Sequence, residues 1–269
     1  MLHSCHIPSD PRPFHDSYFS LIIAMATLPP RGDERKMKTW ATYNHSEVAV
    51  IFVVGTTPKK ENMKSIEEEH QTKNDMVLIS ILDSYNNLTI KVIALFYWAA
   101  TYCSEVNFVF KTDDDMFLNI PKLVQLTEKY RYATRTIFGY IAHKWNAHRN
   151  QLSRYFVSRE EFPLTRYPKF ATGPGYLVTR DAVIAILEKV ITKTKFFKLE
   201  DVYLTGIIAD ELNITRKNVR GFHNYRKYMH LLSSPYKVLS LYTVHEVDVG
   251  GQFYLWNILT GNVCNSINK

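Results

Sequence analysis

Short apolar runs alternate with amphipathic segments through the first half of this 269-residue chain. Apolar, β-branched runs predict strands, and they lie at residues 18–26, 48–54, 76–82, 106–111 and 136–141. Charged or amphipathic segments between them predict helices at residues 33–43, 59–73, 87–103 and 121–130. Alternating strands and helices predict an α/β fold, with a mostly parallel sheet flanked by helices.

The second half is less regular, with helices predicted at residues 181–192 and 201–212. The Pro- and Gly-rich segment 167–175 is interpreted as a loop. We expect a loose arm over residues 1–17 and one domain over residues 18–269, with halves at about 18–120 and 121–269.

Composition narrows the class of protein. The chain is 46% hydrophobic and 22% charged, which is typical of a soluble globular domain. Its net charge of +7 is scattered along the sequence, which argues against a nucleic-acid partner. No window of 18 apolar residues predicts a membrane span, and the run at 19–28 is interpreted as a buried strand rather than a signal peptide. Three N-x-S/T sequons occur, at Asn44, Asn87 and Asn213.

Three consecutive carboxylates, Asp113 to Asp115, follow directly after the apolar run at 106–111. Adjacent carboxylates repel one another and resist desolvation, so a fold keeps them where a cation or solvent neutralises them. A hard, oxygen-rich site of this kind suits Mg²⁺ or Mn²⁺ with a phosphate-bearing ligand. The alternative is a surface turn whose acidic side chains are simply solvated.

Five motifs in a fixed order carry a resemblance to a known family. They are Thr39-Trp40, the segment 83–91 (DSYNNLTIK), Lys111-Thr112-Asp113-Asp114-Asp115, the segment 167–176 (YPKFATGPGY) and Glu200-Asp201-Val202-Tyr203. With these motifs the chain resembles the beta-1,3-galactosyltransferase family, which includes related N-acetylglucosaminyltransferases. The resemblance covers roughly residues 18–250.

The resemblance implies a GT-A type nucleotide-sugar fold forming a single catalytic domain. It further implies a UDP-sugar donor, Mn²⁺ or Mg²⁺ as cofactor, inversion at the anomeric carbon, and a glycan acceptor on a glycoprotein or glycolipid. Family membership would place such an enzyme on the lumenal side of the Golgi, although the expected N-terminal membrane anchor is absent from this chain. A homodimer is left open.

The resemblance also implies roles for particular residues. Asp115 is the main metal ligand, and Asp113 reaches the metal or the donor. A second protein ligand is expected from His245, in Tyr242-Thr243-Val244-His245, with His223 as the alternative. Neutral imidazole is a good Mn²⁺ ligand.

The catalytic carboxylate implied by the resemblance is Asp201, acting as the base that activates the acceptor hydroxyl. Glu200 supports it or binds the acceptor. A structural role at the start of a helix is compatible with either assignment, because acidic residues complement the helix dipole there.

The remaining expected donor contacts are spread along the chain: Lys111, Asp113, Asp114, Gly173, Gly175, Arg31 and Arg35. The family pattern has two arginines four residues apart, the second three residues before the Trp. Those positions here are Asp33 and Met37. Arg31 and Arg35 keep the spacing but lie two residues early.

We therefore expect an inverting, metal-dependent enzyme that transfers a hexose, with galactose the first choice, from a UDP-sugar in beta-1,3 linkage. The altered arginine pattern leaves a second hypothesis, a catalytically impaired glycosyltransferase-like binding or folding partner. A two-metal phosphoesterase or nuclease would need further clustered ligands, and the sequence offers none that is convincing.

Overall fold

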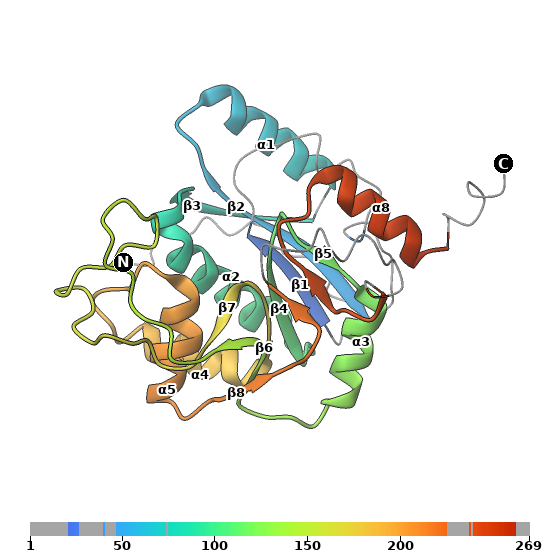
Figure 1. Cartoon of the computed structure of the whole chain (residues 1–269). Helices are drawn as coiled ribbons and strands as arrows, with labels where there is room; N and C mark the ends of the chain where they lie inside the picture. Colours follow the sequence, from blue (N-terminus) through green and yellow to red (C-terminus); the bar gives the residue numbers. More distant parts are fainter. Residues whose placement is uncertain are drawn as a thin grey trace.

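The computed structural model describes residues 21–26, 40, 47–73, 75–224, 237 and 239–261. Its main strands are β1 (Leu21–Ala26), β2 (Val48–Thr56), β3 (Met76–Leu82), β4 (Phe108–Asp113), β6 (Thr136–Ala142), β7 (Phe170–Thr179) and β8 (Thr215–Asn218). They form one sheet in the order β3-β2-β1-β4-β7-β6-β8 (Figure 1). The pairs from β3 to β4 are parallel, β7 runs antiparallel to both of its neighbours, and β8 is parallel to β6.

A small second sheet lies beside the first, in the order β5-β10-β9. Its strands are β5 (Phe117–Leu118), β9 (Phe222–His223) and β10 (Thr243–Val244). The helices are α1 (Lys60–Lys73), α2 (Leu88–Tyr102), α3 (Ile120–Lys129), α4 (Arg180–Val190), α5 (Ala209–Glu211) and α8 (Val249–Leu259). A 3₁₀ turn, η2 (Tyr85–Asn87), precedes α2, and a π-helical segment, η3 (Val202–Ile208), precedes α5.

Both faces of the main sheet are buried, and β1 shows why. Leu21 and Ile23 pack into one core with residues of α1, α3 and α8. Ile22 and Ala24 point the other way, into a second core with α2, α4 and η3. Successive strand side chains point to opposite faces, so a continuous apolar run is what a strand covered on both sides requires.

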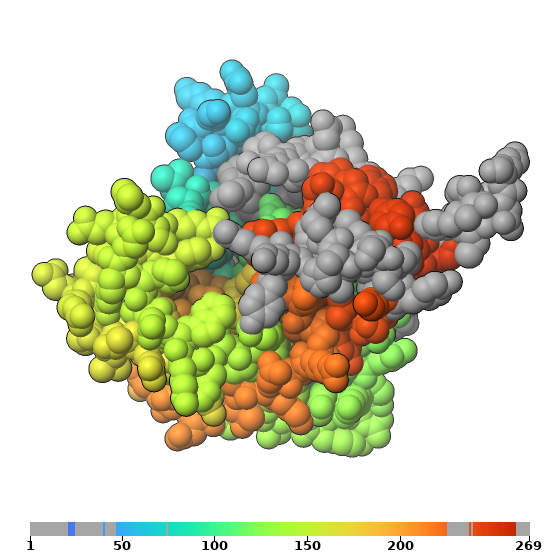
Figure 2. Space-filling view, viewed as in Figure 1, coloured from blue at the N-terminus to red at the C-terminus, as the bar shows by residue number. Residues whose placement is uncertain are grey.

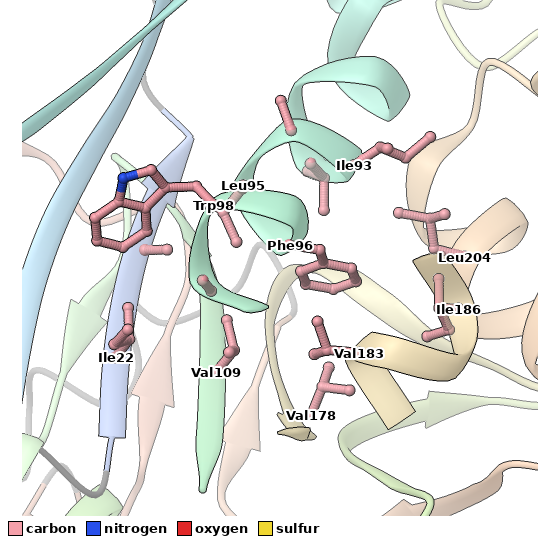
Figure 3. Close-up of a cluster of buried hydrophobic side chains, with 14 of the residues drawn as sticks. Ile22, Ile93, Leu95, Phe96, Trp98, Val109, Val178, Val183, Ile186 and Leu204 are labelled. Carbon is pink, nitrogen blue, oxygen red and sulfur yellow. The ribbon is translucent and has the colours of Figure 1, made fainter. Parts of the chain in front are cut away.

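The second core is packed around α2, between the sheet and α4 (Figure 3). Phe96 from α2 lies near Val178 of the sheet and Val183 of α4 (Figure 3). Removing these side chains from water is the main favourable contribution to this layer. The layer fixes the ends of β4 and η3, which carry the acidic motifs.

The expected α/β class is confirmed: a mostly parallel mixed sheet is flanked by helices, as a GT-A type fold requires. The predicted strands and helices are present within a few residues, apart from the helix at 33–43, of which only Trp40 is among the described residues.

The interpretation of segment 167–175 as a loop is wrong, because most of it belongs to β7, the strand between β4 and β6. Pro174 suggested a loop, since proline cannot donate a ladder hydrogen bond. The pairing of β6 with β7 shifts register between Gly139 and Ile141, and residues 172–175 fall in that irregular stretch. The bulge lets the strand contain a proline.

The motif at residues 83–91 holds three elements together. Asp83 Oδ2 accepts hydrogen bonds from Gly55 N, at 2.9 Å, and from Lys91 Nζ, at 2.7 Å. The side chains of Lys91 and Asp83 are almost fully buried. This pair ties the end of β2 to β3 and to α2, which gives the motif a structural role.

Candidate active site

The carboxyl end of β4 gathers the residues expected to hold a metal. Ligand atoms of Asp113, Asp115 and His245 lie within 4.8 Å of one another. Asp113 ends β4, and Asp115 lies in the turn that leads to β5. His245 follows β10, which pairs antiparallel with β5. The pairing of two short strands therefore brings His245 across to the acidic turn.

The acidic turn is held from several sides. Trp40 Nε1 donates to Met116 O at 2.8 Å, and Val247 N donates to Asp115 O at 2.9 Å. Gln252 of α8 donates to Asp114 O at 3.3 Å. The tryptophan of the Thr39-Trp40 motif is thus an anchor for the turn.

The chemistry of this group fits a hard divalent cation. Asp115 Oδ2 lies 3.3 Å from His245 Nε2. Burial works to raise the pKa of Asp115, but the hydrogen bond and charge of His245 lower it further, so the net shift is downward. Asp115 Oδ1 and His245 Nδ1 are buried and have no hydrogen-bond partner among the described residues. Unsatisfied acceptors beside an ionised carboxylate are what Mn²⁺ or Mg²⁺ would use.

His223, the alternative ligand, is not part of this group. It lies in β9, and its carbonyl accepts a hydrogen bond from His245 N at 3.1 Å. Within the described part of the chain, only His245 joins the two aspartates.

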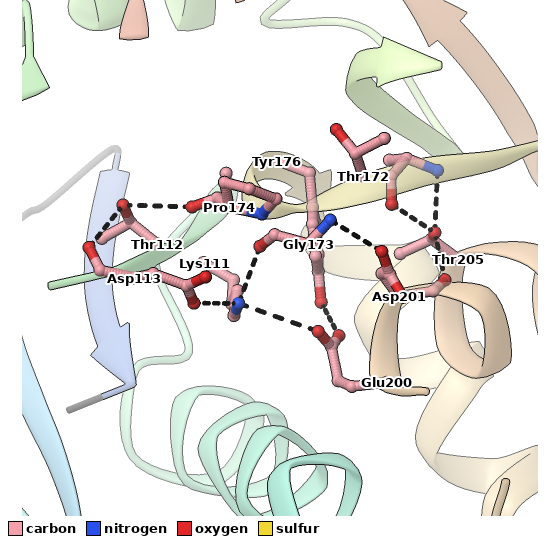
Figure 4. A network of polar contacts seen from close by, with 12 residues as sticks. Lys111, Thr112, Asp113, Thr172, Gly173, Pro174, Tyr176, Glu200, Asp201 and Thr205 are labelled. Carbon is pink, nitrogen blue, oxygen red and sulfur yellow. Dashed lines mark hydrogen bonds and ion pairs between the residues drawn. The ribbon is translucent and has the colours of Figure 1, made fainter. Parts of the chain in front are cut away.

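Asp201 caps the start of η3 (Figure 4). Its Oδ1 accepts from Val202 N at 2.8 Å, and its Oδ2 accepts from Gly173 N at 2.9 Å. A Cβ on Gly173 would lie 3.3 Å from Asp201 Oδ2, so glycine is what allows the carboxylate to approach β7. Burial raises the pKa of Asp201 although both amide bonds oppose the shift. A raised pKa suits a carboxylate that must accept a proton.

Glu200 points inward and contacts protein groups rather than solvent. Its side chain is 2% exposed, accepts a hydrogen bond from the Tyr176 hydroxyl, and lies 3.7 Å from Lys111 Nζ (Figure 4). Burial is the main cause that raises the pKa of Glu200 to about 7.

Three further predicted donor contacts are placed as follows. Lys111 is fully buried, with its ammonium on Asp113 and on Gly173 O. A Cβ on Gly175 would meet Phe110 and Met116 at 3.2 and 3.3 Å, so this glycine packs against the core. Asp114 is exposed. Arg31 and Arg35 lie outside the described residues.

An aromatic group lies beside Asp201, and the sequence did not predict that Tyr85 belongs to it, whereas the family resemblance implied weak sugar or phosphate contacts for Arg154 and Tyr155. The rings of Tyr85 and Tyr155 meet edge to face at 6.2 Å. The Arg154 guanidinium lies 4.8 Å from the Tyr155 ring centre and 5.8 Å from that of Tyr85. Burial raises the pKa of Tyr85, and the charge of Asp201 adds to the shift. The position of Tyr85, in the turn that follows the predicted strand 76–82, could have indicated that its side chain lies near the site.

The space-filling view places this group in context. The segment that follows β6, which carries Arg154 and Tyr155, stands out from the rest of the molecule, and the surface is hollowed beside it (Figure 2). The aromatic faces of Tyr85 and Tyr155 are suited to packing on a sugar ring.

Comparison with known proteins identifies the family. Residues 34–220 match the family model described as Galactosyltransferase. Because that match spans more than half of the chain, the protein belongs to the galactosyltransferase family, as the five motifs predicted.

Relatives of known name are consistent with this family assignment. The chain is 34% identical over 198 residues to beta-1,3-galactosyltransferase 5 of Pan paniscus, covering 74% of this chain and 63% of that protein. It is 30% identical over 244 residues to beta-1,3-galactosyltransferase 1 of Mus musculus, covering 88% of this chain and 73% of that one. The chain thus spans less than two thirds of the length of the first of these relatives.

Two solved structures are distantly similar in fold to this chain. The galactosyltransferase LgtC, in complex with donor and acceptor sugar analogues, matches 89% of this chain and 95% of its own, with 9% identity and a TM-score of 0.43. A 4-diphosphocytidyl-2C-methyl-D-erythritol synthase matches 78% of this chain and 97% of its own, with 11% identity and a TM-score of 0.41. At these scores the likeness carries no argument about function.

Proposed function

We propose that this chain transfers galactose from UDP-galactose to a hydroxyl of a glycan acceptor, with inversion and in beta-1,3 linkage. The observation that carries the proposal is the grouping of Asp113, Asp115 and His245 at the end of β4, on the side of the sheet where Asp201 also lies. Family membership and the printed names of the relatives support the sugar and the linkage.

The positions of the residues suggest a separate role for each group. Asp113, Asp115 and His245 would hold the divalent cation, which when bound neutralises the charge that gathers on the leaving diphosphate. Asp201 accepts the proton of the attacking hydroxyl, since its carboxylate is fixed by two backbone amides and its pKa is raised by burial. Tyr85, Tyr155 and Arg154 offer faces and a cation to the acceptor sugar.

We also place the protein on the lumenal side of the Golgi, because the family resemblance implies that compartment and a glycan acceptor occurs there. Among the described residues, no helix combines the length and the apolar character needed to cross a bilayer.

The hypothesis of a catalytically impaired binding or folding partner is not favoured. It rested on the altered arginine pattern near residues 31–37, which lies outside the described residues. The cation group and the Asp201 cap are both complete in the described part of the chain.

Two conservative variants test the assignment of the base. Purified protein is assayed with UDP-galactose, UDP-N-acetylglucosamine and UDP-N-acetylgalactosamine, with Mn²⁺ or with EDTA, against a panel of glycan acceptors. We expect Mn²⁺-dependent transfer from UDP-galactose. Asp201→Asn should abolish transfer and leave UDP binding nearly intact, because the amide keeps the size of the side chain but cannot take a proton.

Glu200→Gln is the matched control, since it makes the same chemical change one residue earlier. It should keep measurable transfer. Unchanged turnover in Asp201→Asn, or complete loss in Glu200→Gln alone, would show that the base has been assigned to the wrong carboxylate. Transfer that persists in EDTA would remove the metal from the proposal.

A further inference from the structure

Lys111 is a fully buried lysine that lies between Asp113 of the cation group and Gly173 of β7. It lies on β4, two residues before Asp113, and its side chain is 0% exposed. A buried ammonium is costly unless charged or polar partners surround it. Its position therefore calls for an explanation beyond the packing of β4.

The ammonium has partners on three elements (Figure 4). Nζ donates to Asp113 Oδ1 at 2.5 Å and to Gly173 O at 2.7 Å, and it lies 3.7 Å from Glu200 Oε2. The two carboxylates and the carbonyl give the buried ammonium the charged and polar partners that it requires. With no exposed surface, Lys111 is not placed to contact a donor directly.

These partners connect the two halves of the site. Asp113 belongs to the cation group. Gly173 accepts from Lys111 through its carbonyl and donates to Asp201 Oδ2 through its amide. Glu200 precedes Asp201 in the chain and is fixed by the Tyr176 hydroxyl. Lys111 is thus bonded to the residue that orients Asp201 and faces the residue next to it.

We propose that Lys111 is a positioning residue, which fixes Asp201 through Gly173 and Glu200. This proposal rests on the role of Asp201 proposed above. It differs from the sequence-based expectation that Lys111 binds the donor, since the Lys111 side chain is 0% exposed.

The rival account is that Lys111 only neutralises buried carboxylates, so that its loss would damage the fold and nothing more. The two accounts differ in what happens to metal binding and to the Gly173 amide. Removing a positive charge beside Asp113 should make the site more attractive to a cation. General damage to the site should weaken cation binding instead.

The first test is Lys111→Met, which keeps the length of the side chain and removes the charge. Mn²⁺ binding is measured by calorimetry without any sugar, and hydrogen exchange is followed at the Gly173 amide. We expect Mn²⁺ to bind at least as tightly as in the unaltered protein, and the Gly173 amide to exchange faster. Turnover should fall by about 10- to 100-fold, as small misplacements of a catalytic group do, with little change in the KM for the acceptor.

The second test is the double variant Lys111→Met/Glu200→Gln, which no longer buries an uncompensated Glu200. Its thermal midpoint should recover towards that of the unaltered protein, which keeps the test decisive if the single variant does not fold. Turnover and the slow exchange at Gly173 should not recover. Recovery of turnover in the double variant would mean that Lys111 merely neutralises Glu200, and the proposal would be overturned.

Weaker Mn²⁺ binding together with lower turnover in Lys111→Met would also overturn it, as would unchanged turnover. The proposed function can fail separately, because an unaltered protein that transfers no sugar from any UDP-sugar refutes that function. The Mn²⁺ titration and the exchange at Gly173 would still decide whether Lys111 holds Gly173 in place.

Discussion

Four carboxylates of this site have the same chemistry in isolation and different properties in the fold. Asp115 beside His245 has a lowered pKa, whereas burial raises the pKa of Asp201 and of Glu200. Asp113 belongs to the cation group and accepts a hydrogen bond from Lys111. Partners and burial, rather than residue type, separate a metal ligand from a base.

Glu200 gives a prediction about stability and pH. Its pKa is about 7 in the folded protein against an ordinary value of 4.5. The folded protein therefore keeps this proton to higher pH than the unfolded chain, so the free energy of unfolding should fall as pH rises from about 4.5 to 7. The contribution is up to about 3 kcal/mol. Denaturant unfolding of Glu200→Gln, compared with the unaltered protein at pH 4 and pH 8, should show a smaller fall; parallel pH profiles would contradict the shift.

His245 and His223 give a matched pair of variants. His245→Ala should weaken Mn²⁺ binding by at least about tenfold, because even partners outside the ligand set cost that much at metal sites. His223→Ala should bind Mn²⁺ nearly as well as the unaltered protein, since His223 is not in the group. Calorimetric titration measures both. Equal losses in the two variants would show that the strands carrying them are disturbed, and that His245 is no ligand.

At the scale of elements, apolar periodicity was a good guide where one helix or strand has an unambiguous face. The strand expected at 76–82 and the helix expected at 87–103 correspond to β3 and α2. The short strands β5, β9 and β10 were not predicted, because two residues carry no periodicity. They are formed by pairing with one another, and that pairing places His245.

Helix α2 gives a prediction about packing. Phe96 is 0% exposed in the core between the sheet and α4, and Phe96→Ala should lower the free energy of unfolding by about 3 to 5 kcal/mol. Its neighbour Tyr97 is 48% exposed, and Tyr97→Ala should change stability by no more than about 0.5 kcal/mol. Urea unfolding of both variants checks this. Similar losses would mean that α2 presents a different face to the sheet.

At the scale of the whole molecule, one mixed sheet carries the candidate site at the edge where the carboxyl end of β4 lies beside the amino-terminal part of the antiparallel β7. Ligands of α/β proteins bind at the carboxyl ends of strands. The antiparallel strand β7 brings Gly173 beside β4, and η3 then brings Asp201 to Gly173. Residues more than 80 positions apart in the sequence thus share one site.

The proposed lumenal location gives a prediction about modification. Asn213 of the sequon Asn213-Ile214-Thr215 is exposed in the turn before β8, with a φ of 53°, and Thr215 is exposed as well. When the chain is directed into the secretory pathway, Asn213 should carry an N-glycan. Peptide mass spectrometry after glycosidase treatment measures the modification at Asn213, and Asn213→Gln should migrate faster than the unaltered protein by one glycan. An unmodified Asn213 in secreted protein would contradict the expected accessibility.

The sequence by itself determined the α/β class, most of the larger elements and the acidic motifs, because hydrophobic periodicity and local motifs are written in neighbouring residues. It also predicted the pairing of His245 with the aspartates, through the family resemblance.

Only the tertiary structure decided that most of segment 167–175 belongs to a strand, that Lys111 faces inward, and that Glu200 is buried against Tyr176. Each of these depends on which distant segment packs against the residue. Burial and partner charges, which set the pKa of each carboxylate, arise only when the chain has brought those segments together.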